Sequence, residues 1–275
     1  MTYDYVSHKI VLFGGFGPAG YLNDTWTFDG TNWQQINTST QPSARTAARM
    51  ACDRKNGKVV LFGGYDGNNY LGDTWLWDGA NSTWTQANPD RSPAAVTGPM
   101  VFTDLDGRVD EMGGFDGQFY QYLMWQWSGT TWRKLHPSNL PFARSIAAVS
   151  IDPVRKDIVL YGGLGDINPI NTWTYDGATW TEQNPASQPL TVYGASAAFD
   201  PALGVVVLFG GADGGVPQSG TWEWTGSNWV ELSPALSPPA REGAGMAYDK
   251  ALDRIILFGG QSGRNILGDT WELNP

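Results

Sequence analysis

Lys58-Val59-Val60-Leu61-Phe62-Gly63-Gly64 is the stretch that decides the fold, because the chain repeats its pattern six times. The stretch joins an apolar run, which suits a buried strand, to a pair of glycines. The pairs recur at intervals of 49, 50, 49, 48 and 49 residues, at Gly14-Gly15, Gly63-Gly64, Gly113-Gly114, Gly162-Gly163, Gly210-Gly211 and Gly259-Gly260. A fixed period of this length predicts stacked copies of one supersecondary unit, none of which can bury its apolar faces alone.

Each copy of the repeat predicts four short antiparallel strands. In the second copy, a small-residue strand from Arg45 to Asp53 leads through a polar turn to the apolar strand from Lys58 to Phe62. Third and fourth strands follow around Trp75 and Trp84. Such strands form a meander, and meanders repeated radially form a β-propeller, in which the sheet edges are short and protected.

Tryptophans keep the same register through the copies. Those of the third strand are Trp26, Trp75, Trp125, Trp173, Trp222 and Trp271. Those of the fourth strand are Trp33, Trp84, Trp132, Trp180 and Trp229. Because the repeat accounts for these side chains, we interpret them as packing between sheets and not as a ligand-binding cage.

The glycine pair after an apolar strand, followed by the spaced tryptophans, resembles the kelch repeat over essentially the whole chain. The resemblance implies an all-β fold, a six-bladed β-propeller of four-stranded antiparallel blades with a central channel, in a single domain spanning residues 1–275. The blades are expected at about 1–38, 43–88, 93–137, 142–186, 190–234 and 240–275. The family consists mostly of protein- or glycan-binding modules, with a minority of enzymes. Ligands in the family usually meet the loops after the glycine pairs and the starts of the innermost strands.

Both ends of the chain interrupt the repeat. Met1–Asp4 aligns with Met246–Asp249, so the chain begins midway through an innermost strand. It ends after the third strand of the sixth blade, which predicts that this blade lacks its outer strand. The repeat spacing would place the missing strand in about twenty residues before Met1. Either the chain is a fragment, or the strand of Trp271 is an open edge that could pair with a second chain in a homodimer.

Composition restricts the classes of partner. A net charge of −10 argues against nucleic acid and anionic membrane surfaces, which need clustered Lys and Arg. No apolar run approaches the length of a membrane span, and the N-terminus shows no signal peptide. We therefore expect a soluble, acidic protein that is cytoplasmic as given. A secreted or surface module of a longer parent chain is the alternative.

Cysteine and histidine usage argues against metal chemistry. Cys52 is the one cysteine and lies in an apolar column, so we expect a buried thiol. His8 and His136 share no loop with it, and no cluster has the spacing of metal ligands. We therefore expect no metal and no cofactor, and no hydrolase that relies on a histidine base.

Arginines recur where the innermost strands start. Arg45, Arg144 and Arg241 occupy one column, and Arg49 lies deeper among small residues. A guanidinium group binds a carboxylate bidentately, and the kelch resemblance implies that arginines at such positions face the ligand. For the first three arginines, ion pairing with a neighbouring Asp or Glu is an equally weighted alternative.

Aromatic residues gather in the loops after the glycine pairs of the first three blades. Phe16, Tyr65 and Phe115 directly follow their glycine pairs. Further aromatic residues of the same sector are Tyr70, Phe119, Tyr120 and Tyr122. Such side chains could stack against a sugar, anchor a protein partner, or pack within the loops themselves. The sequence leaves these alternatives open.

Aspartates follow the glycine pairs in three blades, at Asp66, Asp116 and Asp213, and each precedes a glycine. They could bind a cation or sugar hydroxyls. The favoured interpretation is turn formation, in which the glycine adopts a positive φ.

Blade 3 departs from the pattern, because Val109-Asp110-Glu111-Met112 replaces the apolar run and Glu111 stands where other blades have leucine. A buried Glu would have a raised pKa and could act as a general acid or base. The favoured alternative is an ion pair with Arg144 or Arg49. Tyr193 and Glu242, which follow the arginine column, could line the mouth of the channel.

We interpret the chain as a binding module for a protein or a carbohydrate-like ligand, using its loop face and channel mouth. The predicted ligand-binding residues are Arg45, Arg49, Tyr65, Asp66, Phe115, Arg144, Tyr193 and Arg241. The alternative is a metal-independent hydrolase, isomerase or lyase that acts on an acidic or glycosidic substrate. Its candidate acid–base groups are Glu111, Asp116 and Tyr193.

Overall fold

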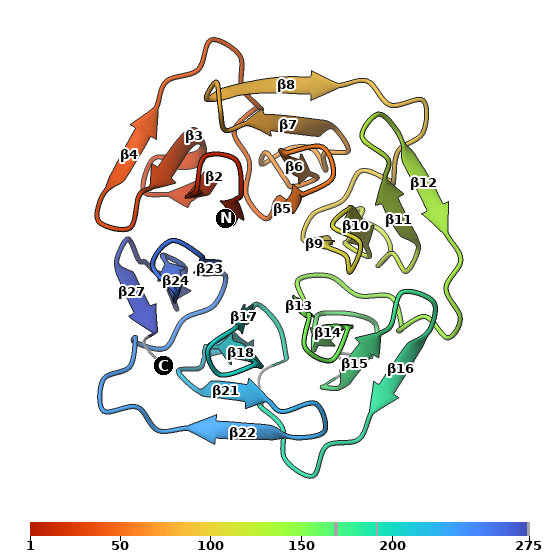
Figure 1. The fold of residues 1–275 in the computed structure, drawn as a ribbon, viewed down its shortest axis with the longest axis vertical. Helices are drawn as coiled ribbons and strands as arrows, with labels where there is room; N and C mark the ends of the chain where they lie inside the picture. Colours follow the sequence, from red (N-terminus) through yellow and green to blue (C-terminus); the bar gives the residue numbers. More distant parts are fainter. Residues whose placement is uncertain (168–169, 191, 274–275) are drawn as a thin grey trace. The chain divides into compact units, whose positions relative to one another are not determined.

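The computed structural model describes residues 1–167, 170–190 and 192–273, and these ranges contain strands and turns but no helix (Figure 1). The predicted blades 4, 5 and 6 include residues 168–169, 191 and 274–275, which lie outside the described part of the chain. No described residue belongs to a helix that could cross a bilayer. The chain divides into two compact units. Unit 1 comprises Met1–His136 with Asp249–Leu252, and unit 2 comprises Pro137–Tyr248 with the residues from Asp253 onward.

Unit 1 contains three four-stranded antiparallel sheets, coloured red to green in Figure 1. Blade 1 consists of β1 (Thr2–Asp4), β2 (Lys9–Gly17), β3 (Gly20–Phe28) and β4 (Trp33–Ile36). Blade 2 consists of β5 (Arg49–Asp53), β6 (Lys58–Phe62), β7 (Thr74–Asp78) and β8 (Thr83–Ala87). Blade 3 consists of β9 (Met100–Thr103), β10 (Val109–Met112), β11 (Met124–Trp127) and β12 (Trp132–Leu135). In each sheet the strands pair in chain order, so the predicted meander is confirmed.

Unit 2 repeats this arrangement in three more sheets. Blade 4 consists of β13 (Ala148–Asp152), β14 (Asp157–Tyr161), β15 (Thr172–Tyr175) and β16 (Trp180–Gln183). Blade 5 consists of β17 (Ser196–Asp200), β18 (Val205–Phe209), β21 (Thr221–Trp224) and β22 (Trp229–Leu232). Blade 6 consists of β23 (Gly245–Asp249), β24 (Arg254–Phe258) and β27 (Thr270–Leu273). Two-stranded hairpins extend the loops of blades 5 and 6, with strands β19 (Ala212–Asp213), β20 (Val216–Pro217), β25 (Gln261–Ser262) and β26 (Asn265–Ile266).

The fold class is therefore the predicted one, an all-β propeller fold with six blades of kelch type. The described part of the last blade has three strands, as expected. One boundary was wrong: the first strand of blade 2 begins at Arg49 and not at Arg45. The physical reason is Ala47, whose φ of +52° is left-handed and cannot continue a strand.

The glycine pairs directly follow the second strand in blades 2 to 6, whereas in blade 1 the pair lies within β2. All six pairs have positive φ at both residues, between 61° and 77° at the first and between 89° and 114° at the second. A Cβ atom on Gly63 would lie 2.8 Å from the carbonyl oxygen of Val96, and one on Gly64 would lie 2.9 Å from that of Thr46. Glycine is therefore required both for the backbone conformation and for the close approach of the next segment.

Apolar side chains of adjacent blades fill the space between the sheets of each unit. In unit 1, Val11 and Leu61 belong to one buried cluster, whereas Val60 and Val109 belong to the next. Three of the fourth-strand tryptophans also bond to a threonine of the preceding blade. Three such indole N–H donors lie 2.8–2.9 Å from a threonine Oγ1, in the pairs Trp84–Thr25, Trp132–Thr74 and Trp229–Thr172. The structure thus confirms that these tryptophans pack between sheets.

A buried aspartate closes the hairpin between the first and second strands of every blade. The six are Asp4, Asp53, Asp104, Asp152, Asp200 and Asp249. In each, Oδ1 accepts a backbone N–H from a residue two to four positions later. Such Asx turns fix the hairpin and keep the carboxylate bonded. An aspartate at the end of every first strand is visible in the repeat, although this column was not among the predicted features.

Candidate functional site

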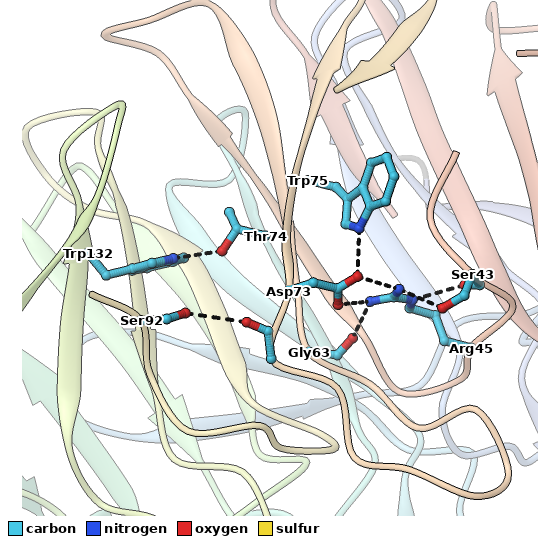
Figure 2. A network of polar contacts seen from close by, with 9 residues as sticks. Ser43, Arg45, Gly63, Asp73, Thr74, Trp75, Ser92 and Trp132 are labelled. Atoms are coloured by element: carbon cyan, nitrogen blue, oxygen red, sulfur yellow. Dashed lines mark hydrogen bonds and ion pairs between the residues drawn. The ribbon is translucent and has the colours of Figure 1, made fainter. Parts of the chain in front are cut away.

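Arg45, Arg144 and Arg241 are buried within their blades and are bonded by their own chain. The Arg45 Nε donates to the carbonyl oxygen of Ser43 at 3.0 Å, and Nη1 donates to that of Gly63 at 3.1 Å. Nη1 and Nη2 also donate to the two carboxylate oxygens of Asp73, at 2.6 and 2.8 Å. Figure 2 shows this clamp, with the indole N–H of Trp75 donating to the same carboxylate.

Blade 6 repeats the clamp with Arg241. Its Nη1 donates to the carbonyl oxygen of Gly259 at 2.9 Å, and the guanidinium group binds both oxygens of Asp269, at 2.6 and 2.8 Å. The hydrogen bond from Arg241 lowers the pKa of Asp269 to about 2. At Asp73, burial alone would raise the pKa, but the hydrogen bond and the charge of Arg45 lower it. Both carboxyl groups are therefore ionised at neutral pH.

Blade 4 has the arginine but not the carboxylate. Arg144 donates from Nη1 to the carbonyl oxygen of Gly162 at 2.8 Å and to Oδ1 of Asn171 at 3.0 Å. Among the described residues, its buried Nη2 has no hydrogen-bond partner, and neither has the indole N–H of Trp173. In blades 2 and 6 the equivalent arginine Nη2 and indole N–H both donate to Oδ2 of the aspartate. In blade 4 the amide nitrogen of Asn171 replaces that oxygen and cannot accept. Burial lowers the pKa of Arg144 to about 10, against the opposing charge of Glu182.

The sequence contains a signal for this clamp. Blades 2, 4 and 6 have arginine in the first column and Asp or Asn 27 or 28 residues later. Blades 3 and 5 have neither residue: the two positions hold Ala95 and Leu123 in blade 3, and Val192 and Gly220 in blade 5. The arginine column and the Asp/Asn column vary together from repeat to repeat, which indicates that the two side chains are in contact.

Replacing Asn171 with aspartate is expected to stabilise the protein. The new carboxylate would accept from Nη2 of Arg144 and from the indole N–H of Trp173, neither of which has a partner among the described residues. Glu182 lies 2.7 Å from the Asn171 amide nitrogen and would repel a carboxylate there, so the Glu182→Gln change should accompany it. We expect a gain of about 1–2 kcal/mol for the double variant in denaturant unfolding, because bonds to charged groups are worth about that much. Glu182→Gln alone is the control, and equal stability of the two would contradict the assignment.

Of the two alternatives for Arg45, Arg144 and Arg241, the geometry favours bonding within the chain. These arginines face the interior, because the carbonyl oxygens after the second strands need donors. We do not carry them into the proposed site. Arg49 is different, because it is half-buried at the start of β5. Its side chain forms no hydrogen bond or ion pair with the described residues. Burial lowers its pKa.

The carboxyl group of Glu111 lies in the interior of unit 1. Glu111 is 2 % exposed. Its carboxyl group forms neither an ion pair nor a hydrogen bond with the described part of the chain. Burial raises its pKa well above the usual value. The expected ion pair with Arg49 is not formed between the described residues of unit 1, and Arg144 is bonded within blade 4. Burial therefore favours the protonated form of Glu111.

The three candidate catalytic residues occupy different settings. Glu111 is buried in β10, whereas Asp116 lies in a loop and accepts backbone N–H groups. Tyr193 belongs to unit 2, where burial and Glu242 raise its pKa. Asp110, beside Glu111, is also buried, and burial and the charge of Asp104 raise its pKa. Within unit 1 the acid–base candidates therefore do not converge.

The loops of unit 1 instead bring aromatic side chains together. Six rings form a continuous series of contacts across three blades, and we call them the aromatic belt: Phe16, Tyr21, Tyr65, Tyr70, Phe115 and Tyr120. Successive ring centroids are 5.2, 6.1, 5.1, 5.9 and 4.9 Å apart. These separations are those of favourable edge-to-face or tilted aromatic pairs.

The aromatic belt is open to solvent. Phe16 is 50 % exposed, and the other five residues are half-buried. Phe119 and Tyr122, in the same blade 3 loop as Tyr120, are 61 % and 54 % exposed. The sequence predicted the aromatic sector but missed Tyr21, which lies not directly after a glycine pair but opposite Phe16 in the extended β2–β3 hairpin.

Tyrosines connect the blades within the aromatic belt. A Cβ atom placed on Gly67 would lie 2.6 Å from the ring of Tyr21, and one placed on Gly117 would lie 2.5 Å from the ring of Tyr70. Each tyrosine of one blade therefore packs on the Asp-Gly turn of the next. Both glycines also have φ near +100°, so these positions need glycine for two reasons.

The aspartates of these turns act as predicted for turn residues. Asp66 Oδ1 accepts the backbone N–H groups of Asn68 and Asn69 at 2.8 and 2.7 Å. Asp116 Oδ1 does the same with Gln118 and Phe119, at 2.8 and 2.7 Å. These hydrogen bonds lower the pKa of both carboxyl groups, which are therefore ionised at neutral pH. They bring fixed negative charge to the edge of the aromatic belt.

Unit 2 has no counterpart of the aromatic belt in the positions after its glycine pairs, which hold Leu164, Ala212 and Gln261. Asp213 occupies the column of Asp66 and Asp116 but pairs across the β19–β20 hairpin. Among the described residues, no group of three or more His, Cys, Asp and Glu side chains could hold a metal ion. Cys52 is buried, as expected, and burial raises its pKa to about 11.

Comparisons with known proteins agree with the repeat. A family model described as the KLHDC2/KLHL20/DRC7 Kelch-repeats domain matches residues 1–163, which include all of blades 1 to 3. A search of curated proteins found no match to the chain.

Proposed function

Because the chain belongs to the family of the KLHDC2/KLHL20/DRC7 Kelch-repeats domain, we propose that it is a protein-binding module whose contact surface is the aromatic belt. Propeller domains of this family generally mediate protein interactions. The observation that carries the proposal is the continuous series of ring contacts from Phe16 to Tyr120 on exposed loops. Aromatic residues of this kind dominate the energetics of protein interfaces.

The loops that carry the aromatic belt are held in place before any partner arrives. The backbone of Tyr65 pairs with Thr46 on one side and with Tyr70 on the other, and Phe115 pairs likewise with Thr97 and Tyr120. The contacts of Tyr21 and Tyr70 with the following blades add to this support. A rigid set of anchors lowers the conformational entropy lost on binding, which favours a recognition surface.

A panning experiment with a random-peptide library displayed on phage tests the proposal. We expect peptides enriched on the wild-type protein to bind the Tyr70→Ser variant about tenfold more weakly, as for an interface anchor worth more than 1 kcal/mol. Phe16→Ser is the second belt variant, since its 50 % exposed ring contributes little to folding. Val216→Ser, 62 % exposed on a unit 2 loop, is the matched control.

Three results would overturn the proposal. The first is an absence of enriched peptides on the folded protein. The second is enriched peptides that bind the belt variants and the control equally well. The third concerns sugars, which also stack on aromatic rings. If a glycan array yields ligands that Tyr70→Ser loses while no peptide is enriched, the carbohydrate alternative replaces the protein partner.

A further inference from the structure

We propose that the segment bound by the aromatic belt presents arginine or lysine side chains, so that the belt recognises a basic stretch of polypeptide. This inference rests on the proposed function and adds the chemistry of the partner. Three features of the unit 1 loops support it: their charge, the state of their carboxylates and the absence of a cation of the described residues over their rings.

The loops that carry the aromatic belt are acidic without any basic residue. The segments 14–24, 63–73 and 113–123 contain four aspartates and eight aromatic residues, but no Lys, Arg or His. Of the four, Asp73 is neutralised by Arg45. Asp24, Asp66 and Asp116 have no salt bridge within the described residues. An uncompensated negative potential on a surface favours partners of opposite charge and speeds their association.

The two carboxylates next to the rings are fixed in place. Asp66 and Asp116 are each held by two backbone N–H groups. Their second oxygens accept only neutral amide groups, from Asn69 at 3.3 Å and from Gln121 at 2.7 Å. Each therefore keeps its full charge and a free lone pair beside a ring of the aromatic belt, as a guanidinium group requires.

No cation of the described residues covers the rings of the aromatic belt. The cation–π contacts found in the described ranges both involve Tyr5, with Arg54 and Lys250. Arg49 lies on β5, outside the loops, and takes part in none of the belt contacts. An aromatic face beside a carboxylate attracts a guanidinium or ammonium group, and arginine more often makes this contact than lysine. The belt repeats that combination in blades 2 and 3.

The peptides enriched in the panning experiment give the first test. We expect belt-dependent peptides to be rich in Arg and Lys relative to the starting library. Belt-dependent peptides without that enrichment would overturn this inference and leave the proposed function intact. An absence of belt-dependent peptides would remove the proposed function itself, so the two failures are distinguishable.

A defined probe gives the second test. Fluorescence polarisation should show a labelled Gly-Arg repeat peptide binding the wild-type protein, with Gly-Ser and Gly-Glu repeats of equal length binding more weakly. The variant Asp66→Asn/Asp116→Asn keeps an oxygen for each turn but removes both charges. We expect its affinity for the Gly-Arg peptide to fall about five- to tenfold, with a weaker dependence on salt.

The matched control removes the same net charge from unit 2. Asp166→Asn/Asp213→Asn changes two exposed aspartates of unit 2 and leaves the loops of the aromatic belt as they are. Its affinity for the Gly-Arg peptide should stay within about twofold of the wild type, since the belt is unchanged. Equal losses in the two double variants would show attraction to the overall acidity of the protein and would overturn the inference, as would a Gly-Arg peptide that does not bind.

Discussion

Replacing Arg45 with methionine is expected to lower the free energy of unfolding by about 3 kcal/mol, which is the lower end of the cost of removing one partner of a buried ion pair. The variant leaves the carbonyl oxygen of Gly63 without its donor and the carboxylate of Asp73 without its counter-ion. The lower end applies because the Asp73 side chain is 25 % exposed and can recover some hydration. For a chain of this size the melting temperature should fall by roughly 10 °C.

The matched control is Lys58→Met in the same blade. Lys58 and Asp78 form an ion pair of 2.7 Å, but their side chains are 34 % and 22 % exposed. Exposed pairs contribute about 0–1 kcal/mol, so this variant should melt within a few degrees of the wild type. Similar losses in the two variants would mean that the Arg45 clamp adds no more than a surface contact, and the structural role assigned here would be wrong.

Replacing Glu111 with leucine is expected to stabilise the protein, and more strongly at pH 7 than at pH 5. Burial raises the pKa of Glu111 in the folded state well above that of the unfolded chain. Between these two pKa values the folded state holds a proton that the unfolded state releases. The stability of the wild type should therefore fall as pH rises from about 4.5, by up to about 1.4 kcal/mol per pH unit from this one group.

Leucine removes that dependence and restores the apolar residue used by blades 2, 4, 5 and 6. We expect a gain of about 2 kcal/mol or more at pH 7, measured as a shift in urea midpoint, because the buried side chain becomes apolar. Asp110 also has a raised pKa and stays in both proteins, so the difference between them isolates Glu111.

Glu111→Gln separates ionisation from hydrophobic burial. It should flatten the pH dependence as leucine does, but without the full gain in stability, because a buried polar group remains. If the stabilities of the wild type and of Glu111→Leu change in parallel between about pH 4.5 and 7, solvent or a partner reaches the carboxyl group. In that case Glu111 would return as a candidate acid–base group.

The fold could be predicted from the sequence because the information is repeated. Six copies of the apolar run and glycine pair determine the blades, and φ values and close backbone approaches explain why both glycines are needed. The start of β5 was misplaced because small residues such as Ala47 suit a strand by composition, and only tertiary contacts show that the backbone turns there.

The candidate site could be predicted only in part, for physical reasons that differ from residue to residue. Arg45 was counted among the predicted ligand-binding residues because the sequence around an arginine next to an innermost strand does not show whether its side chain faces outward or inward. Its partner Asp73 is 28 residues away, and only a comparison between repeats connects the two. Tyr21 was missed because its role depends on Gly67 in the following blade. The sequence shows which residues are aromatic, but not which rings touch.

The way Tyr21 and Tyr70 rest on the next blade has a consequence for how this surface can have arisen. Each tyrosine is encoded in one repeat, and the glycine that accommodates it is encoded in the following one. Duplication of a single repeat copies a tyrosine with its own turn, but it yields a new contact only if the inserted copy and its neighbour are compatible. The heritable unit of the aromatic belt is therefore the junction between two repeats. Gain or loss of a repeat within blades 1 to 3 would alter the recognition surface even where every remaining residue is unchanged.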